Sequence, residues 1–147
     1  MTFFVATFIF ALDRIAKAAA LGNMSDGQSI AVWPGLFHLT LVLNEGTAFG
    51  LFKGCSAFFA AVSSIVIVFI IAYVLKNRPK DASLSVWLGL ILGGAVGNLY
   101  DRAIAGSIID FLDFRIFPVF NIADSAITVG AVMLILRMLI HNAHPRP

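Results

Sequence analysis

Three aspartates lie in the stretch SIIDFLDFRIFPVFNIADSAI, which is otherwise mostly apolar: Asp110, Asp113 and Asp124. Two carboxylates within hydrogen-bonding reach share a proton, because ionising both is costly, so one serves as a base and the other as an acid. If Asp110 and Asp124 meet, a water held between them can attack a carbonyl while the second carboxyl protonates the developing oxyanion. Asp113 follows Asp110 by three residues in a segment of uncertain conformation, and we interpret it as a solvated loop acid.

The other polar residues of interest fall at helical spacing. The sets that share a helix face are Asp13 with Lys17, Asn98 with Asp101 and Arg102, and Asn121 with Asp124. Ionisable groups at membrane depth are costly and usually face a protein interior or a wet cavity. All three sets fall at one boundary of the predicted membrane region, as a single site built from several helix ends requires. Each set also has a structural explanation, as an interfacial ion pair, a helix end or a helix cap.

No competing nucleophile or metal motif is found in the sequence. His38 lies in a predicted strand, while His141 and His144 lie near the C-terminus, far from Cys55 and from any G-x-S-x-G serine. The single cysteine excludes an internal disulfide, and no H-E-x-x-H motif or Cys/His pair is present. We therefore expect no metal and no cofactor.

Composition places the polar residues in a membrane protein. The chain has 147 residues, 60% of them hydrophobic and 12% charged, with a mean hydropathy of +0.95. Such a chain cannot bury its apolar surface in one small core, so residues 1–147 are expected to form a single integral membrane domain. The balance of ten Lys and Arg against eight Asp and Glu gives no support for a nucleic-acid partner.

Four segments approach the roughly 20 mostly apolar residues that a membrane-spanning helix needs. They cover approximately residues 2–21, 56–75, 84–100 and 122–140. The loop between the second and third segments carries Lys76, Arg78 and Lys80, which predicts that it is cytoplasmic. Four spans then place both termini in the cytoplasm and residues 22–55 and 101–123 outside. The charges within the first segment argue against a cleaved signal peptide.

Two features outside the acids predict local structure. Apolar and polar residues alternate from Phe37 to Asn44, which indicates a strand, and Trp33 followed by Pro and Gly indicates a turn at headgroup level. Gly89, Gly93 and Gly97 recur every four residues, which favours close approach of a neighbouring helix over a ligand role.

Two other classes of membrane protein also fit this composition. A small proton-coupled transporter could use intramembrane Asp, Lys and Arg residues as a relay. Relay acids belong at mid-membrane depth, however, whereas these acids gather at one boundary. A non-enzymatic scaffold would tolerate the loss of the acids altogether.

Five sequence blocks identify a family resemblance. They are LDRIAK (12–17), NEGTAFG (44–50), GGAVGNLYDR (93–102), IIDF (108–111) and FNIADSAI (120–127). The chain resembles the lipoprotein signal peptidases, the type II signal peptidases of bacteria, in which these blocks occur in the same order. The resemblance covers essentially the whole chain, and the G-N-x-x-D-R and F-N-x-A-D-S blocks are highly specific.

The resemblance implies a membrane all-α fold of four transmembrane helices with a small extracytoplasmic β-cradle. It implies an aspartic endopeptidase of the bacterial inner membrane, with its active site near the outer face. Such an enzyme removes the signal peptide from diacylglyceryl-modified prolipoproteins, cutting just before the lipidated cysteine. Its expected partners are these substrates and membrane lipid, and we expect a monomer.

The resemblance also assigns residues, with Asp110 and Asp124 as the catalytic dyad. The residues implied to bind substrate or support the site are Asp13, Lys17, Asn44, Gly46, Asn98, Asp101, Arg102 and Asn121. Arg14 stands where the family usually has glutamine, and Glu45 and Thr47 stand where smaller or different residues are common. The connection that follows Asp110 is also compact. These departures concern the charge near the entrance and the length of one loop.

Overall fold

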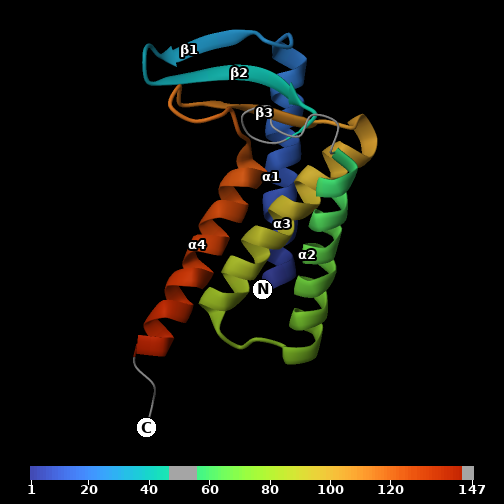
Figure 1. The fold of residues 1–147 in the computed structure, drawn as a ribbon, viewed down its shortest axis with the longest axis vertical. Coiled ribbons are helices and arrows are strands. Elements are labelled where there is room, and N and C mark those ends of the chain that lie inside the picture. The colour runs from blue at the N-terminus through green and yellow to red at the C-terminus, as the bar shows by residue number, and fades with distance from the viewer. Residues whose placement is uncertain (47–55, 144–147) are drawn as a thin grey trace.

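A small antiparallel sheet covers one end of a group of long helices (Figure 1). The computed structural model describes residues 1–46 and 56–143, the last three of these by their backbone only. Its elements are α1 (Thr2–Asn23), β1 (Ser29–Trp33), β2 (Phe37–Asn44), α2 (Ser56–Asn77), α3 (Ala82–Ala105), β3 (Ile108–Asp113) and α4 (Ile122–Ala143). The N-terminus and the connection between α2 and α3 lie at the end away from the sheet.

Helix α3 is the centre of the helical layer, because it packs against α1, α2 and α4. Its glycines permit this, as the spacing predicts: a Cβ on Gly93 would lie 2.5 Å from the carbonyl oxygen of Ala6 in α1. A Cβ on Gly89 would lie 2.7 Å from the carbonyl oxygen of Thr2. The helices therefore approach at backbone distance, which a larger side chain on α3 would prevent.

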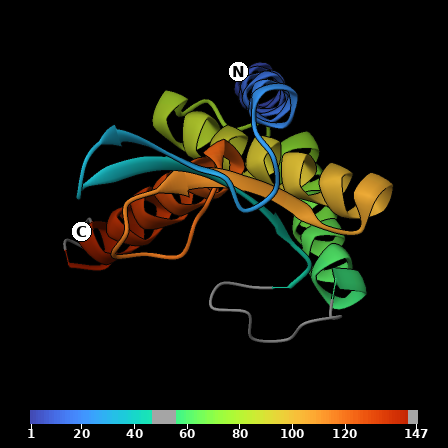
Figure 2. The same cartoon turned by 90° about the horizontal axis from the view of Figure 1, so that it is seen from above.

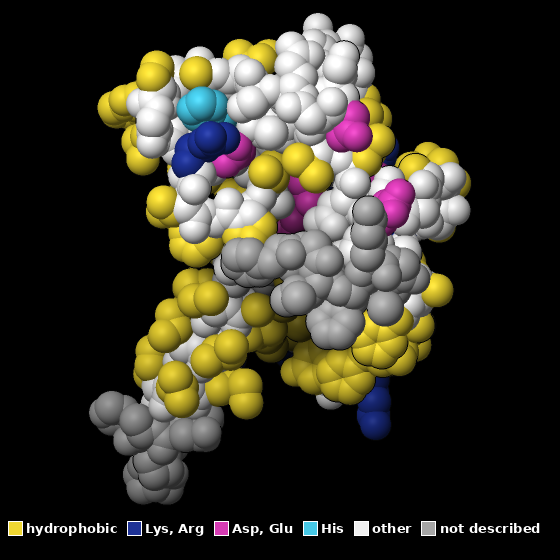
Figure 3. All heavy atoms as spheres, turned by 45° about the horizontal axis from the view of Figure 1, so that its top comes forward, with side chains coloured by type: hydrophobic (Ala, Val, Ile, Leu, Met, Phe, Trp, Pro, Cys, Tyr) yellow, Lys and Arg dark blue, Asp and Glu magenta, His cyan; other side chains and the backbone are white. Residues whose placement is uncertain are grey.

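The helices carry the surface of a membrane protein. Ile65, Val68 and Phe69 of α2 are each at least 66% exposed, and apolar side chains cover the helices below the sheet (Figure 3). Among the described residues, three helices are long and apolar enough to cross a bilayer: Ser56–Asn77, Ala82–Ala105 and Ile122–Ile140. Helix α1 is as long as α2 but is less apolar, so its crossing remains a prediction.

Helix α3 continues to Ala105, beyond the predicted end of the third apolar segment at residue 100. The prediction stopped there because Asp101 and Arg102 interrupt the apolar run. Asp101 is buried against protein, however, so its charge does not end the helix. Gly106 ends it instead, in a left-handed conformation with φ of 72°.

The sheet has the order β1-β2-β3, with both pairs antiparallel (Figure 2). The predicted strand Phe37–Asn44 is confirmed as β2. The predicted turn after Trp33 is confirmed as well, since the Leu36 amide donates to the Trp33 carbonyl at 3.0 Å and Gly35 has a φ of 79°. β2 lies in the middle, so it can present side chains to strands on both sides.

The strand β3 corrects the interpretation of the segment around Asp110 as a loop of uncertain conformation. Five of its six residues are buried, on both of its faces. A strand that is buried on both faces shows no alternation of polar and apolar residues, which is why the sequence pattern did not reveal it. Pairing with β2 sets Asp110 opposite Val42, near the strand end that carries Asn44.

Candidate active site

Asp110 lies on β3 and is only 2% exposed. Its Oδ1 accepts a hydrogen bond from Asn121 Nδ2 at 2.7 Å, and its Oδ2 accepts one from Asn44 Nδ2 at 2.9 Å. Burial raises the pKa of Asp110 to about 6; the two amide hydrogen bonds oppose this rise, and the nearby charge of Asp124 adds to it. Asp110 is therefore a carboxyl that can hold a proton near neutral pH.

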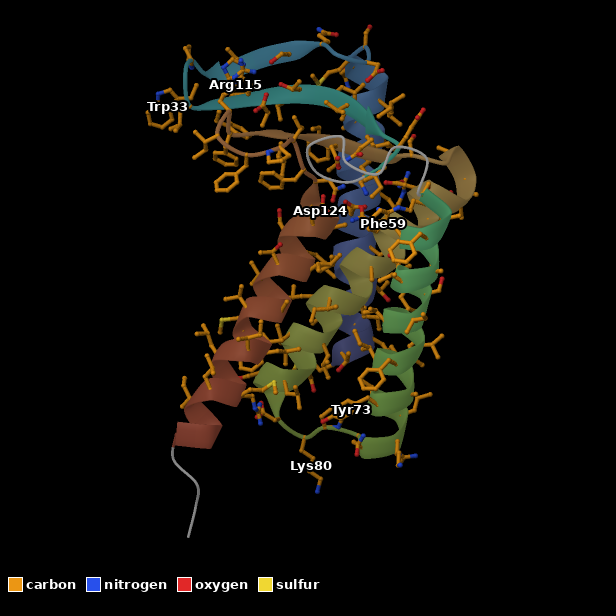
Figure 4. All side chains as sticks on the ribbon, viewed as in Figure 1. Trp33, Phe59, Tyr73, Lys80, Arg115 and Asp124 are labelled. Atoms are coloured by element: carbon orange, nitrogen blue, oxygen red, sulfur yellow. The ribbon has the colours of Figure 1, made fainter. Side chains whose placement is uncertain are left out.

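Asp124 lies in the first turn of α4, at the end that faces the sheet (Figure 4). Its Oδ1 accepts from Asn98 Nδ2 at 2.7 Å, and its Oδ2 accepts from the backbone N–H of Asn121 at 3.3 Å. In return Asn121 Oδ1 accepts from the backbone N–H of Asp124 at 2.9 Å. This reciprocal pattern is a capping box, so the predicted helix cap is present, and the helix N-terminus favours the negative charge.

Asn121 joins the two carboxylates. It is fully buried, and it donates to Asp110 through its side chain and to Asp124 through its backbone. Both aspartates line one cavity of about 660 Å³, together with Asn44 and Arg102. The structure thus brings Asp110 and Asp124, which are 14 positions apart in the chain, to the same cavity.

Arg102 supplies a positive charge to the cavity wall. Its guanidinium lies 5.5 Å from the centre of the Phe59 ring, which α2 provides. Its charge interacts with the carboxylates of Asp124 and Asp110. The guanidinium is thus close enough to the cavity to bind an oxygen of a bound molecule while an aromatic ring supports it.

A second set of charged residues lies behind the cavity, and we call Asp13, Arg14, Lys17 and Asp101 the ionic cluster. The predicted pair on one face of α1 is confirmed, because Lys17 Nζ lies 2.7 Å from Asp13 Oδ2. Lys17 also lies 2.6 Å from Asp101 Oδ2, and Arg14 pairs with the other oxygen of Asp101. Both side chains of the Asp13–Lys17 pair are fully buried, and the cluster contains two acids and two bases.

The ionic cluster touches the cavity residues at two points. Asp13 Oδ1 accepts from the backbone N–H of Ala123 in the first turn of α4, at 3.0 Å. Lys17 Nζ donates to Asn98 Oδ1 at 3.0 Å, while the Nδ2 of the same amide serves Asp124. The two predicted sets on α1 and α3 are therefore one continuous network.

Asp113 contradicts the interpretation as a solvated loop acid. It is buried at the end of β3, where its carboxylate accepts from Thr40 Oγ1 at 2.7 Å and from the Arg115 backbone at 2.8 Å. Burial alone would raise the pKa of Asp113, but these hydrogen bonds lower it below its ordinary value. Thr40 lies on β2, so Asp113 links two strands, and no sequence pattern indicated that partner.

The block from Asn44 to Gly50 is described only in part. Gly46 is buried, and its backbone N–H donates to Asn44 Oδ1 at 3.1 Å, whereas Glu45 is exposed. Thr47 and Cys55 lie outside the described residues. The supporting role of Gly46 stays a prediction, and its hydrogen bond to Asn44 is consistent with that role.

The cavity residues that the sequence reasoning missed include three on α4. Ser125, Thr128 and Val129 line the cavity from α4. A signal for them was available, since Thr128 follows Asp124 by four positions and Val129 follows Ser125 by four, which places each pair on one helix face. They extend the cavity down α4, away from the sheet.

The helices and the cavity together define a class: a membrane protein with two carboxyl groups that line one cavity. The model of the family described as signal peptidase (SPase) II matches residues 5–140, and the chain belongs to this family of membrane peptidases. Family membership leaves the transporter and scaffold alternatives without support.

Individual relatives and a solved structure agree with this membership. The lipoprotein signal peptidase of Desulfitobacterium hafniense is 45% identical over 139 residues, which cover 94% of this chain and 92% of the relative. That of Brevibacillus brevis is 39% identical over 146 residues, 98% of each chain. A solved bacterial membrane enzyme superposes with a TM-score of 0.91 at 30% identity, covering 99% of this chain and 91% of that one.

Proposed function

We propose that the chain is an aspartic endopeptidase of the bacterial cytoplasmic membrane, with Asp110 and Asp124 as its catalytic dyad. Its substrates are diacylglyceryl-modified prolipoproteins, which it cleaves just before the lipidated cysteine. The observation that carries the proposal is the pair of carboxylates that line one cavity and are joined through Asn121. The substrate class is supported by the relatives, which are named lipoprotein signal peptidases.

The surroundings of the two carboxyls support a division of roles. Asp124 lies at a helix N-terminus and accepts from Asn98 and from a backbone N–H, an arrangement suited to an ionised carboxylate that acts as the base. Asp110 has a pKa raised to about 6, chiefly by burial, and acts as the acid that holds the shared proton. No metal and no covalent intermediate is needed.

The reaction takes two steps. Asp124 removes a proton from a water as its oxygen attacks the carbonyl carbon of the scissile peptide, and Asp110 gives its proton to the carbonyl oxygen. The tetrahedral diol then collapses: the C–N bond breaks, the proton on Asp124 passes to the leaving amine, and a hydroxyl proton returns to Asp110. Each carboxyl ends in its starting state, so the dyad is ready for the next substrate.

Contacts with the substrate are assigned to the residues that line the cavity. Asn44 and Arg102 reach it, whereas Asn98 and Asn121 are almost fully buried and serve the carboxylates. We therefore assign substrate backbone or lipidated cysteine to Asn44 and Arg102 alone. The remaining walls are mainly apolar and include Phe117, Val119, Phe120 and Val129, a surface suited to acyl chains.

The proposal places all four helices across the membrane, with the sheet on the outer side. In α1 the charged Asp13 and Lys17 are fully buried against protein, so they do not oppose contact of its other faces with lipid. The α2–α3 connection with Arg78 and Lys80 is cytoplasmic, as are both termini. The dyad then lies near the outer face, where the substrate's lipid anchor holds the cleavage site, and the protein acts as a monomer.

The test is to purify Asp110→Asn and Asp124→Asn variants and to incubate each with a diacylglyceryl-modified prolipoprotein, scoring cleavage on a gel. Both variants are expected to fold, as judged by Tm, and to lose cleavage. Asp113→Asn is the matched control, since it is a buried aspartate on the same strand that does not line the cavity, and it should retain cleavage. A folded dyad variant that cleaves at a near wild-type rate would refute the dyad.

A further inference from the structure

Three asparagines surround the dyad, and each presents its NH2 group to a carboxylate. Asn44 and Asn121 donate to Asp110 at 2.9 and 2.7 Å, and Asn98 donates to Asp124 at 2.7 Å. An asparagine amide has nearly the same shape when it is turned over, but it then offers an oxygen in place of the NH2 group. An oxygen beside a carboxylate would repel it, so the direction of each amide matters for the dyad.

Each of these amides has its oxygen opposite a group that can only donate. Asn44 Oδ1 accepts from the backbone N–H of Gly46, and Asn121 Oδ1 accepts from that of Asp124. Both partners lie within three residues, so local backbone geometry fixes these two amides. Asn98 lies within α3, where no such turn is available, and its oxygen accepts from Lys17 Nζ at 3.0 Å, 81 positions away in the chain.

We propose that Lys17 is a positioning residue for the dyad: its ammonium group, which can only donate, holds the Asn98 amide with its NH2 group toward Asp124. The inference rests on the proposed function and adds a role to a residue outside the cavity. Asn121 Nδ2 also approaches Asn98 Oδ1, at 3.2 Å. One hydrogen of this Asn121 NH2 group is donated to Asp110, however, and the other is shared between Asn98 Oδ1 and the Ile109 carbonyl. Asn121 therefore constrains the Asn98 amide less than Lys17 does.

The ammonium group itself is held in place. Its nitrogen forms ion pairs with the carboxylates of Asp13 and Asp101, at 2.7 and 2.6 Å, and donates a hydrogen bond to Asn98 Oδ1 at 3.0 Å. Two of these partners are carboxylates from different helices, and they fix the position of the nitrogen. With the nitrogen held there, the ammonium group donates to the Asn98 oxygen. If the Asn98 amide were turned over, its NH2 group would face the ammonium group, and neither of the two can accept a hydrogen bond.

Arg14 provides a matched comparison within the same cluster. Like Lys17, it is a base on α1 that pairs with Asp101, and its guanidinium lies 4.6 Å from the centre of the Tyr100 ring. Its contacts are with Asp101 and Tyr100, whereas Lys17 also reaches Asn98. An Arg14→Gln variant therefore weakens the ion pairing but leaves the direction of the Asn98 amide unchanged.

The experiment separates positioning from simple support of the fold. Lys17→Met alone leaves Asp13 buried without its cation, so it is expected to lower Tm and cleavage together. The double variant Lys17→Met/Asp13→Asn removes one charge of each sign and keeps an oxygen for the Ala123 N–H. We expect it to recover Tm to near that of Arg14→Gln, while kcat stays about 10- to 100-fold below wild type, as for outer partners of other catalytic sites.

KM should change little in the double variant, because neither substituted residue lines the cavity. Arg14→Gln is expected to keep kcat within about twofold of wild type. A double variant that recovers kcat together with Tm would show that Lys17 only supports the fold. A double variant that stays as unstable as Lys17→Met would equally overturn the assignment, because the loss would then be structural.

The outcomes also separate this inference from the proposed function. If the two dyad variants are inactive and the double variant has wild-type kcat, only the positioning role fails. If Asp110→Asn or Asp124→Asn still cleaves the prolipoprotein at a near wild-type rate, the dyad fails, and the positioning role fails with it, whatever the double variant does.

Discussion

Two neighbouring pairs of carboxylates in this protein, the one in the ionic cluster and the dyad, differ in the charge of the groups that contact them. In the ionic cluster, Asp13 and Asp101 face the cations Lys17 and Arg14. In the dyad, the carboxylates accept hydrogen bonds mainly from neutral asparagine amides. Asn98 contacts both sets, since its oxygen accepts from Lys17 and its NH2 group donates to Asp124.

Under the proposed function, the difference separates the acids that support the fold from the acids that react. A cation paired with a buried carboxylate stabilises its negative charge, and such a pair between two helices links them. A buried carboxyl whose hydrogen-bond donors are neutral amides has no paired cation to offset the cost of burying its charge. Burial therefore raises the pKa of Asp110, although its two amide hydrogen bonds act against the rise. The ionic cluster therefore links helices α1 and α3, while Asp110 has the raised pKa that the proposed acid requires.

We expect the strongest loss of cleavage when a further cation, in addition to Arg102, is placed next to Asp110. Asn44→Lys places an ammonium beside Asp110, which would lower the pKa of that carboxyl and remove the shared proton. We expect cleavage to fall by about 100-fold or more, comparable to the loss of a main electrostatic contact in other enzymes. Thr40→Lys is the control on the same strand, because Thr40 contacts Asp113 and does not line the cavity. If Asn44→Lys cleaved at the wild-type rate, the absence of a contacting cation would not matter for the dyad, and the contrast with the ionic cluster would be wrong.

The second prediction concerns stability as a function of pH. The folded-state pKa of Asp110 is raised from 3.8 to about 6, so its contribution to stability is fully present below about pH 4 and is lost as pH rises to about 6. The Asp110→Asn variant does not lose this contribution. Its free energy of unfolding, relative to that of the wild type, should therefore rise by up to about 3 kcal/mol over this pH range and then level off. Unfolding in detergent at several pH values measures it.

Asp113→Asn is the comparison with the opposite sign. Its folded-state pKa is lowered, so the Asp113 carboxylate stabilises the fold above pH 3.8 and loses this effect as pH falls through the folded-state pKa. Asp113→Asn should consequently destabilise the protein at neutral pH and less so in acid. If both variants shift stability in the same direction as pH rises, the two aspartates do not differ as described.

The third prediction tests how closely the ionic cluster is packed. A Cβ on Gly97 would lie 2.7 Å from Asp13 Oδ2, so Gly97→Ala must displace that carboxylate. We expect a loss of about 1 to 3 kcal/mol in the free energy of unfolding, as for other overpacked sites. Gly22→Ala is the control, because nothing lies within 4 Å of its added Cβ. Equal Tm values for the two variants would contradict the close packing.

The smallest effect is expected at an ion pair that is not buried. Asp81 and Arg137 pair near the end of the helices away from the sheet, with side chains that are about 40% exposed. Solvent screens such a pair, so Arg137→Gln should change Tm less than Arg14→Gln, whose partner Asp101 is buried. Tm values for the two variants, measured in one detergent, compare an exposed with a buried ion pair.

Local patterns determined a large part of the helical layer. Runs of apolar residues located the helices to within a few positions, and the spacing of Asp13 and Lys17 predicted their ion pair. Alternation revealed β2 but could not reveal β3, because both faces of β3 are buried. These successes and the failure have one cause: periodicity reports which side of an element is buried only when one side is not.

Composition and residue spacing were enough to predict a membrane protein with acids at one boundary, and the ordered blocks indicated the family. The partners of each acid, in contrast, depend on contacts between elements that are distant in the chain. Asp110 and Asp113 are three positions apart on one strand, yet one meets Asn121 in a cavity and the other meets Thr40. The physical reason is that a carboxylate's proton affinity depends on the donors and charges around it, and here these come from other strands and helices.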